Sequence, residues 1–191
     1  MKTQYPDIQY RFNCMACGDC CRGRQAVALN RHDLILMAHH LKMKNTQELF
    51  NTGLCMVQST DAGYWRPFIR FRTKPIRMCP FLENEVLENG QVRGLCQLHP
   101  DAKPLVCHLA PLGRLINLSD GVESWQINEP SPGCPGMDKG PVRNLPVEIM
   151  NFRQRLDEET HFFHFLEQNS PSCPDRASAI EKLFSIDIAQ G

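Results

Sequence analysis

The sequence predicts a single α+β domain, rich in cysteine, in which short antiparallel hairpins and helices surround one or two metal centres and a helical tail follows. Three observations lead to this prediction. The chain has 10 cysteines among its 191 residues, and four of them fall within eight positions. An Asn-Gly and an Asp-Gly dipeptide each lie between short runs typical of strands, which indicates hairpins. The C-terminal part has the apolar spacing of amphipathic helices.

The composition limits the classes of protein to consider. Lys and Arg total 21, as do Asp and Glu, so the net charge is zero and binding to nucleic acid through charge is not expected. No apolar run approaches the roughly 18 residues of a membrane span, and the first residues lack the apolar stretch of a signal peptide. We therefore expect a cytoplasmic protein without a membrane partner. In a reducing compartment, so many cysteines indicate metal binding or redox chemistry.

The first elements follow the cysteine-rich start. Residues 25–29, Gln-Ala-Val-Ala-Leu, are typical of a short strand. Asn30, with Asp33 three residues later, has the N-cap signature of a helix that continues to Leu41. The same signature, an Asn followed by an acidic residue at the third position, predicts a short helix over residues 45–50.

The next segment, residues 64–74, alternates with period two and predicts a strand. One face carries Ile69, Phe71 and Thr73, and the other carries Arg70, Arg72 and Lys74. The basic face is a candidate contact for a phosphate, an acidic peptide or an acidic redox partner. The alternative is an ordinary solvated face of an antiparallel sheet.

Two hairpins are predicted in the middle of the chain. Asn89-Gly90 and Asp120-Gly121 each indicate a type I′ turn between two strands. Between these hairpins, residues 99–107 are expected to form a short helix with a proline near its first turn. Residues 130–141 are rich in proline and glycine and are expected to form a loop.

The C-terminal part is predicted to be helical. Residues 146–168 have the apolar periodicity of a long amphipathic helix, and residues 176–184 that of a second helix. We therefore divide the chain into a metal-binding domain, residues 1–145, and a helical extension, residues 146–191, that packs on it.

The run from Cys14 to Cys21 is the strongest signal in the chain. Cys14, Cys17 and Cys20 are separated by two residues each, a spacing that lets a tight loop bring several sulfurs to one metal centre. Cys21 directly follows Cys20, and adjacent side chains diverge by about 100° on a helix. We therefore expect the first three cysteines to serve one centre and Cys21 to turn toward a second.

Four later cysteines have suitable contexts as ligands: Cys79, Cys96, Cys107 and Cys134. With the run, they make eight thiols, which equals two sets of four. The alternative is that these later cysteines are buried and inert in the core. Cys55 and Cys173 have no spaced partner and are expected to be structural.

The ordered set of cysteines resembles the CxxCxxCC cysteine-cluster family, the YkgJ-like proteins described as zinc- or iron-chelating. The matching text is Phe12-x-Cys14-x-x-Cys17-Gly-x-Cys20-Cys21, then Cys79-Pro-Phe-Leu82, Cys96 to Cys107 with Lys103-Pro104 between them, and Cys134-Pro135. The resemblance implies that the eight matched cysteines bind an iron–sulfur cluster or zinc. The flagellin lysine methylase has a related cysteine pattern, but nothing in this sequence indicates a site for a methyl donor.

The sequence departs from the family pattern at three positions. Family members often have Tyr where His99 stands, Arg where Lys103 stands, and Arg where His108 stands. Lysine lacks the planar, bidentate donor of arginine. His99 and His108 are therefore candidates for alternative metal ligands, or for groups that bond to the ligands.

The metal and the role of the protein are predicted less directly. Three cysteines in a Cys-x2-Cys-x2-Cys run favour an iron–sulfur cluster, most of all [4Fe–4S], over zinc. The nearby cations Arg22, Arg24 and Lys103 suit the negative charge of either centre. We expect a redox or protein-modifying role, with a redox partner or a protein substrate. The alternative is a structural zinc domain that mediates protein interaction, and no catalytic signature indicates an enzyme.

Overall fold

The fold is an assembly of short hairpins and helices around one long helix. The computed structural model describes residues 6–23 and 25–188. Within these ranges, the helices are α1 (Asp19–Arg22), α2 (Arg31–His40), α3 (Gln47–Asn51), α4 (Leu105–Leu109), α5 (Leu145–Asn169) and α6 (Arg176–Leu183), with a short 3₁₀ turn at Ser170–Ser172. The mixture of helices and short antiparallel hairpins confirms the predicted α+β class.

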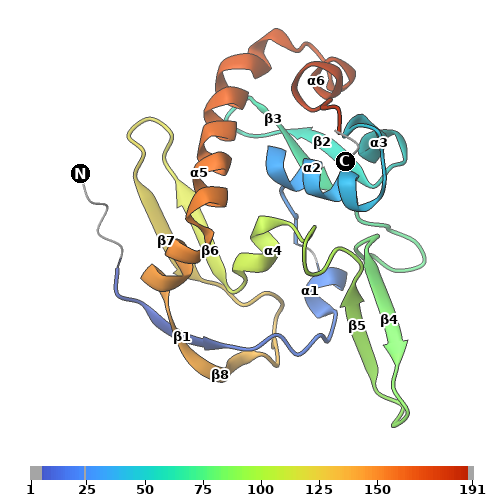
Figure 1. Ribbon diagram of the computed structural model, residues 1–191, viewed down its shortest axis with the longest axis vertical. Helices are drawn as coiled ribbons and strands as arrows, with labels where there is room; N and C mark the ends of the chain where they lie inside the picture. The colour runs from blue at the N-terminus through green and yellow to red at the C-terminus, as the bar shows by residue number, and fades with distance from the viewer. Residues whose placement is uncertain (1–5, 24, 189–191) are drawn as a thin grey trace.

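The described strands pair as four separate antiparallel ribbons of two strands each. They are β1 (Gln9–Phe12) with β8 (Met137–Asn144), β2 (Cys55–Ser59) with β3 (Trp65–Ile69), β4 (Leu82–Val86) with β5 (Val92–Cys96), and β6 (Leu112–Ile116) with β7 (Glu123–Ile127). In Figure 1 the β4–β5 hairpin projects beside α1, whereas the β6–β7 hairpin runs alongside α5. No helix in the described ranges is long and apolar enough to cross a membrane.

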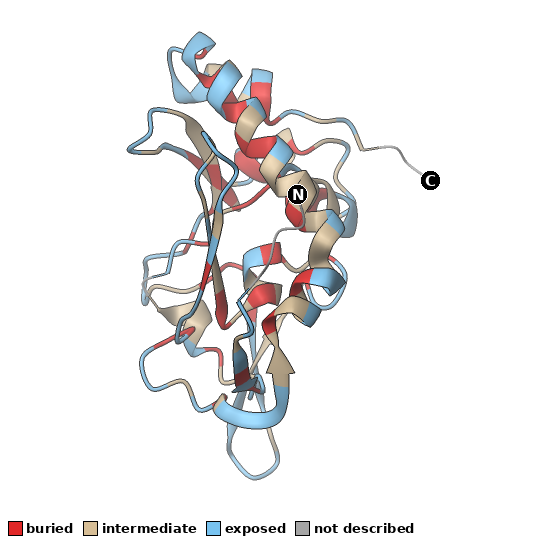
Figure 2. Ribbon diagram, turned by 90° about the vertical axis from the view of Figure 1, so that its left-hand side faces the viewer, coloured by how far each residue is buried: buried red, intermediate tan, exposed pale blue. Residues whose placement is uncertain are grey.

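The long helix α5 contributes to two clusters of buried side chains. Near its C-terminal end, Phe162 and Leu166 belong to the larger cluster, which also contains residues of α2, α3, β2, β3 and α6. Near its start, Leu145, Ile149 and Leu156 pack in a second cluster with residues of β1, α4, β6 and β7. Figure 2 shows buried positions recurring along this helix. The C-terminal helices therefore share their core with the cysteine-bearing part, and the division at residue 145 remains a prediction.

The start of α2 shows how a local signal is used again in the tertiary structure. Asn30 and Asp33 form the expected capping box, because the Asn30 side chain accepts from the Asp33 N–H at 2.8 Å and the Asp33 carboxylate accepts from the Asn30 N–H at 3.1 Å. The same carboxylate accepts from the Leu105 N–H at 3.0 Å and from Arg155 at 2.9 Å. Burial raises the pKa of Asp33, and the hydrogen bonds from these donors offset only part of this rise. The carboxylate thus joins α2, α4 and α5.

Several elements follow the sequence prediction, and their signals are local. The helices α2, α3, α5 and α6 and the hairpins β4–β5 and β6–β7 all lie where the apolar periodicity, caps and turn dipeptides placed them. The turn type was wrong, however. Gly90 and Gly121 adopt positive φ, 79° and 70°, whereas Asn89 and Asp120 do not, as a type I′ turn would require. Both hairpins therefore close with longer loops.

The expected strand at residues 25–29 is replaced by an extended segment with a single bridge, Ala28 to Phe68. Backbone bonds Leu29 N to Pro67 O and Ile69 N to Val27 O place it beside β3. No regular strand develops, because the cap of α2 follows at once.

The expected strand at residues 64–74 also ends early, since β3 stops at Ile69. Residues 70–78 form a loop closed by paired backbone bonds between Arg72 and Met78, at 2.8 and 3.0 Å. Pro75, inside this loop, has no N–H with which to continue a ladder. The partner strand β2 was not predicted from the sequence.

Two other boundaries were wrong for similar reasons. The helix expected over residues 99–107 begins only at Leu105, because Pro104 adopts an extended backbone (φ −56°, ψ 146°) and the residue before a proline disfavours the helical region. The loop expected over residues 130–141 ends at Met137, where β8 begins and pairs with β1. Neither β1 nor β8 was predicted, since their pairing joins the two ends of the cysteine-rich region.

Candidate metal centre

The loop that carries the first cysteines packs backbone to backbone against β5. Gly18 precedes α1 in the left-handed conformation, with φ 76°, which a residue with a Cβ adopts only with strain. The Gly94 N–H of β5 donates to the Ala16 carbonyl at 2.6 Å. A Cβ built on Gly94 would lie 2.7 Å from the Cα of Gly18. The glycines at these two positions therefore let the cysteine loop approach the hairpin closely.

Five cysteines from separate segments converge next to this contact, and we call them the five-thiol group: Cys20, Cys21, Cys79, Cys96 and Cys107. Cys20 and Cys21 lie on α1, Cys96 ends β5 and Cys107 lies on α4. Cys79 is held by its backbone N–H, which donates to the Cys21 carbonyl at 2.7 Å. Figure 1 shows α1, α4 and the base of the β4–β5 hairpin as neighbours.

The electrostatics of this group show that its thiols interact. The pKa of Cys79 is raised to about 11, mainly by burial and in part by neighbouring thiolates at Cys96 and Cys20. Burial also raises the pKa of Cys107 to about 12, and Cys96, Cys20 and Cys79 act in the same direction. Neighbouring thiols with raised pKa values do not readily ionise on their own. Such thiols are a suitable donor set for a metal centre, because the positive charge of a metal favours deprotonation.

Lys103 is a cation within electrostatic range of three thiols of this group. Its charge lowers the pKa values of Cys20, Cys96 and Cys107, in each case against the effect of burial. The lysine directly precedes Pro104 and α4. It therefore supplies one positive charge to a site whose bound thiolates carry several negative charges.

Cys20 and Cys21 do not diverge as expected. Their sulfurs lie 3.9 Å apart and share a hydrogen bond, which lowers the pKa of Cys20 and raises that of Cys21. Adjacent positions on a helix are about 100° apart, but α1 has only one turn and rotation about each χ1 brings the two sulfurs together. The angle between adjacent positions on a helix was therefore insufficient to assign these two cysteines to different centres.

The other three predicted ligands, Cys14, Cys17 and Cys134, are connected by different contacts. Burial is the largest cause of the raised pKa of the Cys17 thiol, and a nearby thiolate at Cys134 raises this pKa as well. Cys14 is exposed, but the neighbouring Asn13 donates its N–H to the Gly136 carbonyl at 3.0 Å, beside the loop that holds Cys134. We call Cys14, Cys17 and Cys134 the three-thiol group.

The spacing of the sulfurs bears on the kind of centre. Within residues 6–23 and 25–188, no three His, Cys, Asp or Glu side chains are close enough together to hold a single metal ion. In a tetrahedral zinc site with Zn–S bonds of about 2.3 Å, each pair of sulfurs lies about 3.8 Å apart. The sulfurs of Cys20 and Cys21, 3.9 Å apart, have that spacing.

The two candidate histidines differ in their surroundings. His99 is exposed, and its backbone N–H donates to the Cys96 carbonyl at 3.0 Å. His108 is half-buried with its ring centre 6.0 Å from that of Phe152. The pKa of His108 is lowered to about 4, mainly by burial and in part by the charges of Lys103 and Arg155. The His99 backbone N–H also bonds the Cys96 thiol and lowers its pKa against the effect of burial. The role of the two histidine side chains as ligands remains a prediction.

The basic residues also lie near the thiols, but in different ways. Arg70, Arg72 and Lys74 are exposed on the loop after β3, and the charge of Arg72 lowers the pKa of Cys79 against burial. Arg22 donates to the Cys17 carbonyl at 3.3 Å and to the Asn84 side chain at 2.6 Å. It therefore fixes the backbone of the cysteine loop. Arg24 lies outside the described residues.

The remaining cysteines, Cys55 and Cys173, are buried. Burial raises the pKa of Cys55 to about 12, and a charge on Cys79 adds to the shift. The sequence offered no signal that Cys55, on β2, lies near the five-thiol group. Cys173 follows the 3₁₀ turn and belongs to the larger core cluster.

Comparison with known proteins agrees with this arrangement of cysteines. A family model described as "CxxCxxCC: Putative zinc- or iron-chelating domain" matches residues 13–135, a range that contains all eight predicted ligands. The same comparison with curated proteins and with solved structures gives no match. The family description supports metal binding by this chain. The chain therefore belongs to the CxxCxxCC family of zinc- or iron-chelating domains.

Proposed function

We propose that the protein is a cytoplasmic iron–sulfur protein with a redox role, and that its centres are [4Fe–4S] clusters. The observation that carries this proposal is the convergence of five thiols from α1, β5, α4 and the loop at Cys79. A cluster of this type takes four cysteine thiolates. It also occupies space between its ligands, which suits thiols that interact electrostatically without meeting at the spacing of a mononuclear zinc site.

The two thiol groups suggest two centres that share α1. Cys79, Cys96 and Cys107 with one of the two α1 cysteines would hold the first cluster. Cys14, Cys17 and Cys134 with the other α1 cysteine would hold the second. This division uses all eight cysteines in two sets of four, as the ligand count of such clusters requires. Adjacent cysteines in a run can serve different clusters in two-cluster ferredoxins.

The chain supplies charge and shielding to the first of these centres. Four thiolates around a [4Fe–4S]²⁺ core leave a charge of about −2, by the formal charges of the ligands. Lys103 opposes part of that charge, and the burial of Cys79 and Cys107 limits access of water. When bound, a cluster of this type accepts and donates single electrons, at a potential that charge and solvent exposure determine.

Metal and sulfide analysis of protein purified without oxygen tests this proposal. Two [4Fe–4S] clusters predict about eight irons and eight sulfides per chain, with a brown colour. About four irons would indicate that only one group is loaded. A colourless protein with neither iron nor sulfide would contradict the proposal.

Zinc is the second candidate, because one observation favours it. The 3.9 Å between the sulfurs of Cys20 and Cys21 matches the edge of a zinc–thiolate tetrahedron, about 3.8 Å. In that case the metal would tie α1 to the neighbouring segments and leave an interaction domain without redox activity. Stoichiometric zinc in a colourless preparation would support this alternative.

A redox role requires a partner, and the exposed loop after β3 has the charge for one. Arg70, Arg72 and Lys74 are exposed, and Arg72 lies within electrostatic range of Cys79. We propose that an acidic redox protein docks on this loop. Oxidation of the reduced protein by an acidic ferredoxin-like acceptor should then slow as the salt concentration rises, because salt screens exposed charges. A rate that does not change with salt would contradict this contact.

A further inference from the structure

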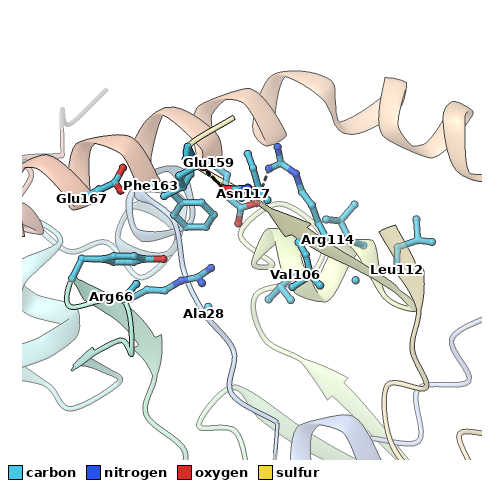
Figure 3. A pocket seen from close by; sticks show the side chains of 17 residues that line it. Ala28, Arg66, Val106, Leu112, Arg114, Asn117, Glu159, Phe163 and Glu167 are labelled. Carbon is cyan, nitrogen blue, oxygen red and sulfur yellow. Dashed lines mark hydrogen bonds and ion pairs between the residues drawn. The ribbon is translucent and has the colours of Figure 1, made fainter. Parts of the chain in front are cut away.

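A cavity of about 580 Å³ lies away from the thiols, between β3, α4, β6 and α5. Its walls are largely apolar and include Val106 and Leu109 from α4, Leu112 from β6, and Phe163 from α5. Arg66, from β3, also lines it. Figure 3 shows the guanidinium of Arg66 pointing into the space between Phe163 and Val106. Neither the family description nor the proposed redox function accounts for this arrangement.

The guanidinium of Arg66 is held in position without a hydrogen-bond acceptor. Its Cζ lies 4.5 Å from the centre of the Phe163 ring, so the ring covers one face of the guanidinium. Its Nε is buried and has no partner, and no residue of the described chain bonds or pairs with its terminal nitrogens. Burial lowers the pKa of Arg66. The buried Nε without an acceptor costs free energy, whereas the terminal nitrogens are not fully buried and can bond a ligand in the cavity.

The neighbouring arginine of the cavity, Arg114, also has a buried Nε without a partner, but its terminal nitrogens are paired. Arg114 is nearly fully buried and bonds Glu123 at 2.6 Å and Glu159 at 3.1 Å. Glu159 acts on Arg66 only through its charge, which opposes the lowering of the Arg66 pKa by burial. Of the two carboxylates that line the cavity, Glu159 pairs with Arg114 and Glu167 lies 3.9 Å from His164, and in the described chain neither forms an ion pair with Arg66.

We propose that this cavity binds a small monocarboxylate with an apolar body. The carboxylate would accept two hydrogen bonds from Arg66, whose planar fork of donors matches it. The apolar body would lie against Val106, Leu109 and Leu112. Glu159 and Glu167 also line the cavity, so a dianion such as phosphate would meet more repulsion than a single carboxylate does.

The position of the cavity connects it with the thiols. Val106 and Leu109 line the cavity, while Cys107 of the same helix belongs to the five-thiol group. A ligand on Arg66 would therefore contact the helix that carries one predicted metal ligand. Binding of the carboxylate itself rests only on the cavity and on Arg66, and does not require a particular metal.

Three probes that differ only in their polar end test the proposal. Isothermal titration calorimetry with the protein as isolated would compare 3-phenylpropionate with 3-phenylpropan-1-ol and 3-phenylpropan-1-amine. We expect the acid to bind at least about 10-fold more tightly than the alcohol or the amine, as charge-assisted hydrogen bonds allow. Arg66→Met should remove this preference, and Arg66→Lys should keep part of it.

Arg70→Gln serves as the matched control, because Arg70 follows the same strand but is exposed. It should bind the acid as the unchanged protein does. The Arg66→Met protein should keep its metal content and melt no lower than the unchanged protein, since it loses a partly buried charge that has no ion-pair partner in the described chain. Equal affinity for acid and alcohol, unchanged binding by Arg66→Met, or no binding of the acid at millimolar concentration would each overturn the proposal.

Discussion

Cys107→Ala is expected to remove the centre of the five-thiol group and about half of the bound iron, if each group holds one [4Fe–4S] cluster of four thiolates. Cys107 is half-buried on α4, and its thiol interacts with those of Cys96, Cys20 and Cys79. Alanine keeps the helix but removes the sulfur, so the group loses one of its thiolate ligands. Iron and sulfide analysis, together with the visible spectrum, measures the loss.

Cys173→Ala is the control for this substitution. Cys173 is buried in the larger core cluster, and its sulfur bonds to the Ser172 side chain and the Asn169 carbonyl. We expect full metal content and a small loss of stability. Equal iron in the two variants would show that Cys107 is not a ligand. Cys17→Ala should remove the other half of the iron, and its residual spectrum should differ from that of Cys107→Ala.

Gly94→Ala is expected to separate the cysteine loop from β5 and to lower the metal content strongly, although no ligand is changed. The added Cβ would lie 2.7 Å from the Cα and 2.9 Å from the nitrogen of Gly18. These are backbone atoms, so the loop must move as a unit. Gly18 begins α1, which carries Cys20 and Cys21, and Cys96 lies two residues after Gly94. The clash therefore acts between parts of one thiol group.

The stability of Gly94→Ala should also fall, by about 1–3 kcal/mol, as is typical of overpacking at a close contact. Gly113→Ala is the matched control, since Gly113 also lies in a strand without positive φ, and a Cβ there would meet the flexible side-chain amide of Asn128. That amide can move away at little cost. Thermal unfolding and metal analysis of both proteins provide the comparison. Full metal binding by Gly94→Ala would contradict the close packing of the cysteine loop on β5.

Local signals in the sequence were sufficient for much of the fold. Asn30 and Asp33 predicted the capping box of α2, and the apolar period predicted α5, because both depend on residues within one or two turns. Gly90 and Gly121 predicted two hairpins, although not their turn type. The predicted start of α4 was wrong because Pro104 adopts an extended backbone, and the spacing of apolar residues gives no indication of this.

The sequence by itself determined which residues are the candidate ligands and which family the chain belongs to, since spacing and order are properties of the chain alone. Only the tertiary structure decided how the thiols are grouped. Cys79 joins Cys21 through a backbone bond between distant segments, and the approach of Cys20 to Cys21 depends on side-chain rotamers. The unpaired cation of Arg66 is likewise visible only after folding, because it depends on which carboxylates Arg114 has already taken. Contacts between distant segments arise from packing of the whole chain, and no local pattern of residues specifies them.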